Sequence, residues 1–277
     1  MHKVCIIGVG WLGFDLAKQL SQQQYEVCGT VRQEEKAKHF SETLSSNIAS
    51  FDIYQSVSAE EAKALFSDSI VVINIAAGRL SVDCTAYSKA VLHTIKTAFS
   101  CQAKKVIFIS TTSVFAGKHG AINNTSQVAP ISESGRAHVA IEQHLQQKYL
   151  SNSTVLSLSG LVGFNRDGTY RHPILTLSKK GTVSDSQLSV NLIHKTDVIR
   201  SINAVIENNI WGETLNLCSL DHPTKAQYYS WCAEQFGLTE PLFEMSDKPN
   251  RFIIGEESFR ILGVEPAFSS PYDMVPC

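Results

Sequence analysis

The chain has 277 residues, of which 43% are hydrophobic and 18% are charged, and its formal net charge is −2. A chain of this length can bury a sizeable core, as one large domain or as one domain with a smaller lobe. The near-neutral charge offers no basic face for nucleic acid, and no apolar run approaches the length of a membrane span.

The N-terminal sequence MHKVCIIGVG enters a strand directly, without the plan of a signal peptide. The seven cysteines are odd in number and include no C-x-x-C pair. This pattern favours reduced thiols and a cytoplasmic protein over a disulfide framework or a metal site.

The first half of the chain alternates apolar, β-rich runs with helical patterns. Leu12, Leu16 and Leu20 share one face of the first helix, and further helices are expected at 83–100 and 134–150. Strands are predicted at 3–8, 26–31, 49–53, 70–76, 105–110 and 154–159. Their nearly continuous apolar character is typical of strands buried on both faces. The alternation predicts an α/β fold with a Rossmann-type, doubly wound parallel sheet.

The rhythm changes after residue 160, where the chain becomes rich in loops. A helix at 197–207 and a strand at 213–218 are expected to return to the sheet, and helices are expected at 224–237 and 256–262. We therefore expect a Rossmann domain and a smaller C-terminal substrate lobe, with the aromatic run 228–231 in the core of the lobe. The proposed boundaries are 1–160 for the Rossmann domain, completed by about 188–218, and 161–187 with 219–277 for the lobe.

The sequence GVGWLG between the first strand and the first helix is a G-x-G-x-x-G pattern formed by Gly8, Gly10 and Gly13. The first glycine permits a tight turn, the second lets the backbone approach a pyrophosphate, and the third allows the helix to pack on the strand. The strand–turn–helix context is the one that a dinucleotide site requires. We therefore expect this loop, including Trp11 and Leu12, to bind a dinucleotide at the helix N-terminus.

The end of the second strand bears on which dinucleotide is bound. An NAD site usually has Asp or Glu there for the ribose 2′-hydroxyl, whereas this chain has Thr30 and Arg32 and no acid before Glu34. A hydroxyl and a guanidinium suit a 2′-phosphate. NADP is therefore preferred, with NAD as the second choice, although an arginine at the start of a helix can also be merely solvated.

Two further strand ends are candidates, because ligands of open α/β sheets bind outside the carboxyl ends of the strands. The small residues Ala76, Ala77 and Gly78 would let the backbone pass close to a cofactor, or they pack a helix; we favour cofactor contact. Asp52, at the end of the third strand, is the weaker candidate.

Together these residues resemble the extended short-chain dehydrogenase/reductase superfamily, in its NAD-dependent epimerase/dehydratase group and its atypical, YeeZ-like branch. Beyond the glycine loop, the resemblance lies in ISTTSVFAG (109–117), LSLSGLVGFNR (156–166), NLIHKTDVIRSI (191–202) and the segment 212–238. The resemblance implies NAD(P) binding and a small-molecule substrate, often a nucleotide-sugar. It also implies a possible homodimer through the helices 83–100 and 134–150, whose apolar stripes permit one.

Active members of this family use a Tyr as general acid/base, with a Lys four residues later that lowers its pKa. Glu142 matches the Glu that follows this pair, and the register then places Ser134 at the Tyr position and His138 at the Lys position. Phe115 stands where the family often has a further Tyr. The usual Tyr-x-x-x-Lys pair is therefore missing.

Three residues remain as catalytic candidates. Thr111 matches the family's substrate-orienting hydroxyl, or it caps the strand end. His138 can transfer protons near neutrality or hold a ribose hydroxyl, and Ser134 can cap the helix. We favour binding or structural roles for Ser134 and His138 over a proton relay.

Other polar residues have simpler explanations. Asp197, close to His194, is a natural N-cap of the helix that follows. Arg166, Arg171 and Lys179 or Lys180 lie in the loop-rich region, where they contact an acidic substrate or form a solvated face.

Two functions follow from these observations. One is an NADP-dependent oxidoreductase, epimerase or dehydratase with altered proton-transfer groups. The other is a catalytically silent NADP-binding sensor or scaffold, which is what retention of the cofactor signature without Tyr and Lys predicts.

Overall fold

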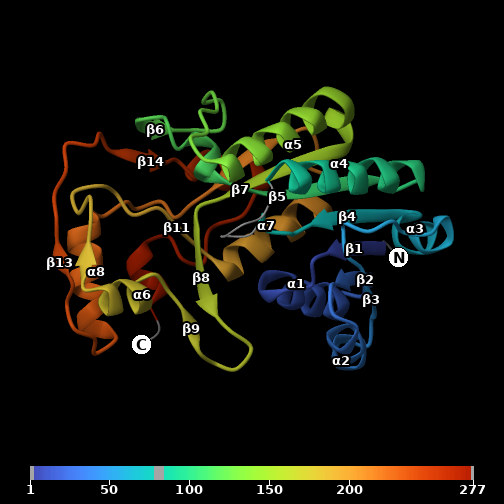
Figure 1. The fold of residues 1–277 in the computed structure, drawn as a ribbon, viewed down its shortest axis with the longest axis horizontal. Helices are drawn as coiled ribbons and strands as arrows, with labels where there is room; N and C mark the ends of the chain where they lie inside the picture. Colours follow the sequence, from blue (N-terminus) through green and yellow to red (C-terminus); the bar gives the residue numbers. More distant parts are fainter. Residues whose placement is uncertain (1–2, 78–83, 276–277) are drawn as a thin grey trace.

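The computed structural model describes residues 3–77 and 84–275, so the predicted cofactor residue Gly78 lies outside the described residues. A seven-stranded sheet forms the centre, in the order β12-β7-β5-β4-β1-β2-β3, and all its neighbours pair in parallel (Figure 1). The strands are β1 (Lys3–Ile7), β2 (Glu26–Val31), β3 (Asn47–Ser50), β4 (Ser69–Ile73), β5 (Lys105–Thr111), β7 (Ser153–Leu158) and β12 (Thr214–Leu217). The strand order reverses between β1 and β4, which confirms the predicted doubly wound sheet.

Helices cover both faces of the sheet. One face packs against α1 (Trp11–Gln22), α2 (Glu34–Leu44) and α7 (Lys195–Glu207), and the other against α3 (Ala59–Phe66), α4 (Cys84–Ser100) and α5 (Glu133–Tyr149). Alternate residues of β1 enter opposite clusters: Val4 and Ile6 belong to the first, and Cys5 and Ile7 to the second. The apolar strands are therefore buried on both faces, as predicted.

The apolar stripes of α4 and α5 pack inside the chain. Tyr87, Val91 and Ile95 of α4 are fully buried in the same cluster as Ile141 and Leu145 of α5. The outward positions of α4 include the exposed residues Lys89, His93 and Lys96. These stripe residues are thus used for intramolecular packing, and a dimer through the two helices stays a prediction.

The remaining elements lie on one side of the sheet, beyond β12 and α7. They are β8 (Gly160–Phe164), β9 (Tyr170–Arg171), β11 (Leu192–His194), α6 (Ile174–Lys180), α8 (Lys225–Gln235) and α9 (Glu256–Leu262), with the strand pairs β10 (Thr182–Val183) with β13 (Leu242–Phe243) and β6 (Gly120–Ile122) with β14 (Arg251–Ile253). Figure 1 shows α6, α8 and β13 at the end of the molecule opposite α3. Tyr228 and Tyr229 are buried in their apolar cluster, and Trp231 packs against it. The aromatic run 228–231 therefore belongs to the core of this lobe, as predicted.

Two predicted helix caps are wrong because the helices begin earlier than their patterns suggested. The helix α7 starts at Lys195, and its N-cap is His194, whose Nδ1 accepts the Thr196 N–H at 3.2 Å. Asp197 instead accepts the backbone N–H groups of Ala267 and Phe268 at 2.7 and 3.1 Å, which ties the C-terminal segment to α7.

The helix α5 also has a different N-cap from the one considered in the sequence. Ser132 accepts the Gly135 N–H at 3.0 Å, so Ser134 is not the cap but lies within the first turn. The side chain of Ser134 is therefore not needed to satisfy the helix terminus.

Within the described residues, no helix is long and apolar enough to cross a membrane. The same residues contain no group of three or more His, Cys, Asp or Glu side chains that could hold a metal ion. The cysteines among them are free.

Candidate functional site

The glycine loop is a tight turn whose backbone leaves no room for side chains at two of its positions. Gly8 has a φ of +102°, and a Cβ there would lie 2.4 Å from the Asn74 carbonyl oxygen. A Cβ on Gly13 would lie 2.4 Å from the Gly8 carbonyl oxygen, so α1 packs directly on the turn. Asn74 Nδ2 donates to that same carbonyl at 3.0 Å, which fastens the loop to the end of β4.

Gly10, the middle glycine of the pattern, differs from the other two because a Cβ there would meet nothing within 4 Å. Gly10 is the N-cap of α1, no side chain caps this end, and the first turn contains no acidic residue. The first N–H groups of a helix have no partner within the helix, and the helix dipole makes this end positive. Open space in front of an uncapped helix N-terminus fits a pyrophosphate.

The end of β2 supports this loop through its backbone. The carbonyl of Thr30 accepts the N–H groups of Gly8 and Val9 at 3.2 and 2.8 Å, and its side chain is 2% exposed. Arg32, two residues later, is exposed at the same edge of the sheet. Asp52, at the edge next to β3, accepts the Tyr54 N–H at 3.1 Å and so closes a local turn.

Tyr87 joins the loop after β4 to the candidate catalytic helix. Its hydroxyl donates to the Ile75 carbonyl at 2.8 Å, immediately before Ala76 and the buried Ala77. Its ring also packs against His138, with 5.5 Å between ring centroids. Burial raises the pKa of Tyr87, so this phenol stays protonated and acts as a fixed donor. A phenol on an apolar helix stripe predicts only a core residue, so the sequence gives no signal for this contact.

His138 is buried, with 6% of its surface exposed, and lies between Tyr87 and Phe108. Its Nδ1 lies 2.8 Å from the Ser134 carbonyl oxygen, so Nδ1 is the protonated nitrogen of the neutral ring. Burial lowers the pKa of His138. The imidazole is therefore neutral at pH 7 and is held within its own helix.

Thr111 ends β5, and its Oγ1 accepts the Ser113 N–H at 3.2 Å, so the strand-capping role that was considered for it is observed. The start of α5 lies beside the turn that follows, because a Cβ on Gly135 would be 3.2 Å from the Ser113 carbonyl oxygen. The structure therefore brings the end of β5 and the first turn of α5 to the same edge of the sheet.

A hydrogen bond inside the core connects the same two elements. Ser110 donates to Oε1 of Glu142, and both side chains are buried. Burial raises the pKa of Glu142 to about 7, and the hydrogen bond from Ser110 partly opposes this rise. In the sequence, Glu142 served only to fix the register of the family motif.

Trp11 of the glycine loop contacts the lobe. Its Nε1 donates to the Phe164 carbonyl at 2.9 Å, and the cationic groups of Arg171 and Lys195 lie 4.6 and 5.1 Å from its ring centroids. The buried Lys195 also pairs with Asp15 of α1. Cations over an indole face attract its π-system, so these contacts hold the lobe against the loop.

Arg166 makes a second connection between the lobe and the sheet domain. Its guanidinium lies 4.7 Å from the ring centroid of Phe14 and 4.5 Å from that of Phe40. Arg166 therefore packs against α1 and α2, away from the lobe cavity. The sequence left open whether Arg166 contacts a substrate or is solvated, and in the structure its guanidinium contacts these two rings.

The lobe contains a cavity of about 620 Å³ between β8, α6 and α8, lined by Arg171, Lys180, Lys225 and Asp185 among others. The volume is within the range of small-molecule sites. The sequence left open whether Arg171 and Lys180 contact a substrate or form a solvated face, and it gave no signal for Lys225, which has the pattern of an ordinary residue at a helix start. Lys179, the other lysine considered, is exposed and does not line the cavity.

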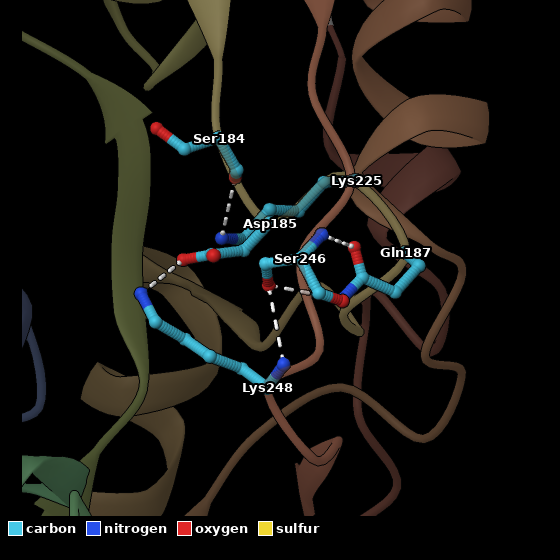
Figure 2. A network of polar contacts seen from close by, with 6 residues as sticks. All are labelled: Ser184, Asp185, Gln187, Lys225, Ser246 and Lys248. Carbon is cyan, nitrogen blue, oxygen red and sulfur yellow. Dashed lines mark hydrogen bonds and ion pairs between the residues drawn. The ribbon is translucent and has the colours of Figure 1, made fainter.

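Figure 2 shows the polar network at one wall of this cavity. Lys248, which does not line the cavity, pairs with Asp185 at 3.0 Å. Lys225 donates to the Ser184 carbonyl at 3.3 Å. Because Lys248 compensates the one carboxylate, the cavity presents an excess of positive charge to a ligand.

His172 forms another part of the wall. Its Nδ1 accepts the Ile174 N–H at 3.2 Å, so its protonated Nε2 donates to the Tyr228 hydroxyl at 2.8 Å, and that hydroxyl donates to the Pro271 carbonyl at 3.0 Å. Burial lowers the pKa of His172 to about 4. His172 is therefore a neutral, structural wall residue at physiological pH.

A glycine loop at the switch point of a doubly wound sheet, next to a basic lobe cavity, defines a class of nucleotide-binding α/β proteins. The model of the NAD dependent epimerase/dehydratase family matches residues 4–218. The chain belongs to this family, which confirms the resemblance found in the sequence.

Individual relatives agree. Protein YeeZ of Escherichia coli (strain K12) is 30% identical over 278 residues, which cover 99% of this chain and 99% of that protein. The structure of UDP-glucuronic acid 4-epimerase from Bacillus cereus in complex with NAD is similar, with a TM-score of 0.79 and 20% identity over 99% of this chain and 95% of that one. The structure of UDP-glucose 4-epimerase from Thermotoga maritima with UDP-glucose is also similar, with a TM-score of 0.78 and 18% identity over 99% of this chain and 96% of that one. The two solved structures support the Rossmann-type fold.

Proposed function

We propose that this chain is an NAD(P)-binding, epimerase/dehydratase-like oxidoreductase that acts on a nucleotide-sugar. The observation that supports it most strongly is the open, uncapped N-terminus of α1 at Gly10, joined through Trp11 and Arg171 to the basic lobe cavity. A nicotinamide dinucleotide supplies hydride transfer when bound. The chain's own residues bind its pyrophosphate at α1 and hold the substrate's anionic groups in the cavity.

For the cofactor, we propose NADP as the preferred dinucleotide, with NAD as the second choice. The exposed Arg32 at the end of β2 supports this preference, as does the lack of an acidic residue before Glu34. The solved neighbour from Bacillus cereus contains NAD. The preference therefore has to be measured directly.

We expect Arg32→Gln to reduce the preference for NADP over NAD by about tenfold, because it removes a charged hydrogen bond to the 2′-phosphate. Dissociation constants for NADP⁺ and NAD⁺ from calorimetry measure it. Lys18→Gln is the matched control, since Lys18 is an exposed lysine of α1 and its loss changes the net charge equally. If Arg32→Gln and Lys18→Gln bound NADP⁺ with equal affinity, Arg32 would not contact the 2′-phosphate.

For the substrate, we expect UDP-glucose or UDP-glucuronic acid to bind in the lobe cavity, with Arg171 holding an anionic oxygen. Arg171→Gln should raise the dissociation constant about tenfold, which corresponds to the loss of one charged hydrogen bond. Lys179→Gln, nearby but outside the cavity lining, is the control. Titration of the cofactor-saturated protein measures the effect, and an unaltered constant in Arg171→Gln would place the sugar nucleotide elsewhere.

The alternative is a catalytically silent dinucleotide-binding sensor or scaffold. It is supported by Ser134 and His138 at the positions of the family's Tyr and Lys, and by the enclosure of the His138 ring between Tyr87 and Phe108. Incubation with both cofactors and the nucleotide-sugars, followed by chromatography of the products, separates the two functions. Turnover that is lost in Thr111→Val supports the enzyme, and binding without any turnover supports the silent protein.

A further inference from the structure

A row of small polar side chains crosses the α5 face of the central sheet. Ser157 of β7 is the register partner of Ser110 on β5 and of Asn216 on β12. Register partners in a parallel sheet project to the same face, and Val155, two residues before Ser157, belongs to the cluster that contains the α5 residues. Ser157 and Asn216 are fully buried, and Ser110 is 4% exposed.

The row continues beyond the strands at both ends. At the inner end, Ser110 donates its hydroxyl proton to Glu142. At the outer end, Oδ1 of Asn124 accepts the Asn216 backbone N–H and the Ser258 hydroxyl, each at 2.9 Å. Asn124 is half-buried in the turn after β6, between exposed neighbours. The row therefore leads from a buried carboxyl group to the surface.

The middle of the row has polar atoms that lack protein partners. Among the residues that the structure describes, Ser157 Oγ, both amide atoms of Asn216 and Nδ2 of Asn124 have no hydrogen-bond partner. Leaving such a buried group unsatisfied costs free energy, and native proteins satisfy nearly all such groups. Ser157 and Asn216 lie on adjacent strands, whose backbones are about 4.8 Å apart, and a water molecule can bridge side chains on neighbouring strands.

We propose that Ser157, Asn216 and Asn124 bind a buried chain of ordered water molecules, which links Glu142 through Ser110 to solvent at the Asn124 turn. Ordered water inside proteins typically makes two to four hydrogen bonds to otherwise unsatisfied groups, and these side chains provide both donors and acceptors. None of the contacts described above for the candidate site involves these three side chains.

The chain of water gives Glu142 a route for its proton. For the proton to leave, the Ser110 hydroxyl turns from Glu142 to a water molecule, donates its own proton there and accepts the carboxyl proton of Glu142 in its place. A hydronium ion then leaves at the Asn124 turn. His138 lies one helical turn before Glu142 on α5, and the ring of Tyr87 of α4 packs against His138. Burial raises the pKa of Glu142, and the hydrogen bond from Ser110 lowers it.

A crystal structure at a resolution that shows ordered solvent tests the site. We expect water oxygens within hydrogen-bond distance of Ser157 Oγ and of the Asn216 amide. In Ser157→Val, which replaces the hydroxyl with a methyl group, we expect the water at this position to be lost. If the wild-type side chains turn to bond one another and enclose no water, the proposal is overturned.

A titration provides the second test. With protein labelled at the Glu carboxyl carbon, the resonance lost in Glu142→Gln identifies this residue, and its midpoint is followed by NMR. We expect the midpoint to rise in Ser157→Val, because water that solvates the carboxylate is removed. Ser201→Ala is the control, since the buried Ser201 hydroxyl on α7 also lacks a partner among the described residues but lies against the other face of the sheet. A midpoint in Ser157→Val equal to that of the wild type would overturn the link.

Discussion

Gly10→Ala is expected to abolish dinucleotide binding and to lower the melting temperature of the ligand-free protein less than Gly13→Ala does. The added Cβ meets no protein atom within 4 Å, so the only cost to the free protein is the backbone conformation, whose ψ of −139° at a φ of −91° lies outside the regions that alanine favours. The methyl group would instead occupy the space in which the pyrophosphate approaches the backbone. A bound ligand stabilises by mass action, so a wild-type rise in melting temperature with NADP⁺ or NAD⁺ should disappear in this variant.

Gly13→Ala is the matched comparison on the same loop. Alanine in a helix is intrinsically favoured over glycine by roughly 0.5–1 kcal/mol, yet this Cβ would lie 2.4 Å from the Gly8 carbonyl oxygen. We therefore expect Gly13→Ala to lower the melting temperature of the ligand-free protein more than Gly10→Ala does. A full ligand-induced rise in Gly10→Ala would show that the loop does not hold the dinucleotide.

Glu142→Gln is expected to stabilise the protein at pH 8 and to leave its stability unchanged at pH 4. In the fold the pKa of Glu142 is raised to about 7, above the ordinary value of 4.5, so its protonated form favours folding. The stability that this group contributes is fully present below pH 4.5 and is lost as the pH rises through 7. Glutamine remains neutral throughout and keeps an acceptor for Ser110. The gain at pH 8 is about 3 kcal/mol, because the pKa differs by about 2.5 units between the folded and unfolded states and one unit corresponds to about 1.36 kcal/mol.

Denaturant unfolding at several pH values between 4 and 8 measures this difference. Glu133→Gln, on the exposed first turn of the same helix, is the control, because a solvent-exposed ion pair with Arg136 contributes little to stability. Its stability should follow the wild-type pH profile. If the profiles of Glu142→Gln and the wild type were parallel, the buried carboxyl group would not change protonation in this range.

The strands of the sheet could be predicted because each has its own run of apolar residues. The residues at which several strands begin or end could not be predicted in the same way. The predicted strand 70–76 ends at Ile73 in the structure, since the side chain of Asn74 turns to the Gly8 carbonyl. The predicted strand 49–53 is formed by Asn47–Ser50, because pairing with β2 places Asn47 opposite Cys28, and Asp52 then closes a turn. In both cases a tertiary partner outweighs the local apolar pattern.

Some residues of the candidate site could likewise be predicted from the sequence, and others could not. Gly8, Gly10 and Gly13 were found because their spacing alone has a physical meaning at a strand–helix turn. Trp11 gave no sign of its contacts with Arg171 and Lys195, which lie far along the chain. Ser110, Ser157 and Asn216 each look like ordinary strand residues, and only the register of three strands places them in one row. A single sequence contains no record of that register.

The position of β12 at the edge of the sheet has a consequence for biosynthesis. This strand pairs with β7, but the segment between them contains β8, β9, α6, β10, β11 and α7. During translation β7 therefore exposes unpaired backbone groups until all of that segment has left the ribosome. Exposed strand edges invite pairing with other chains, and long-range closure is slow. The nascent chain passes through a stage in which an apolar sheet edge is open, and a chaperone that covers such edges would act at that stage.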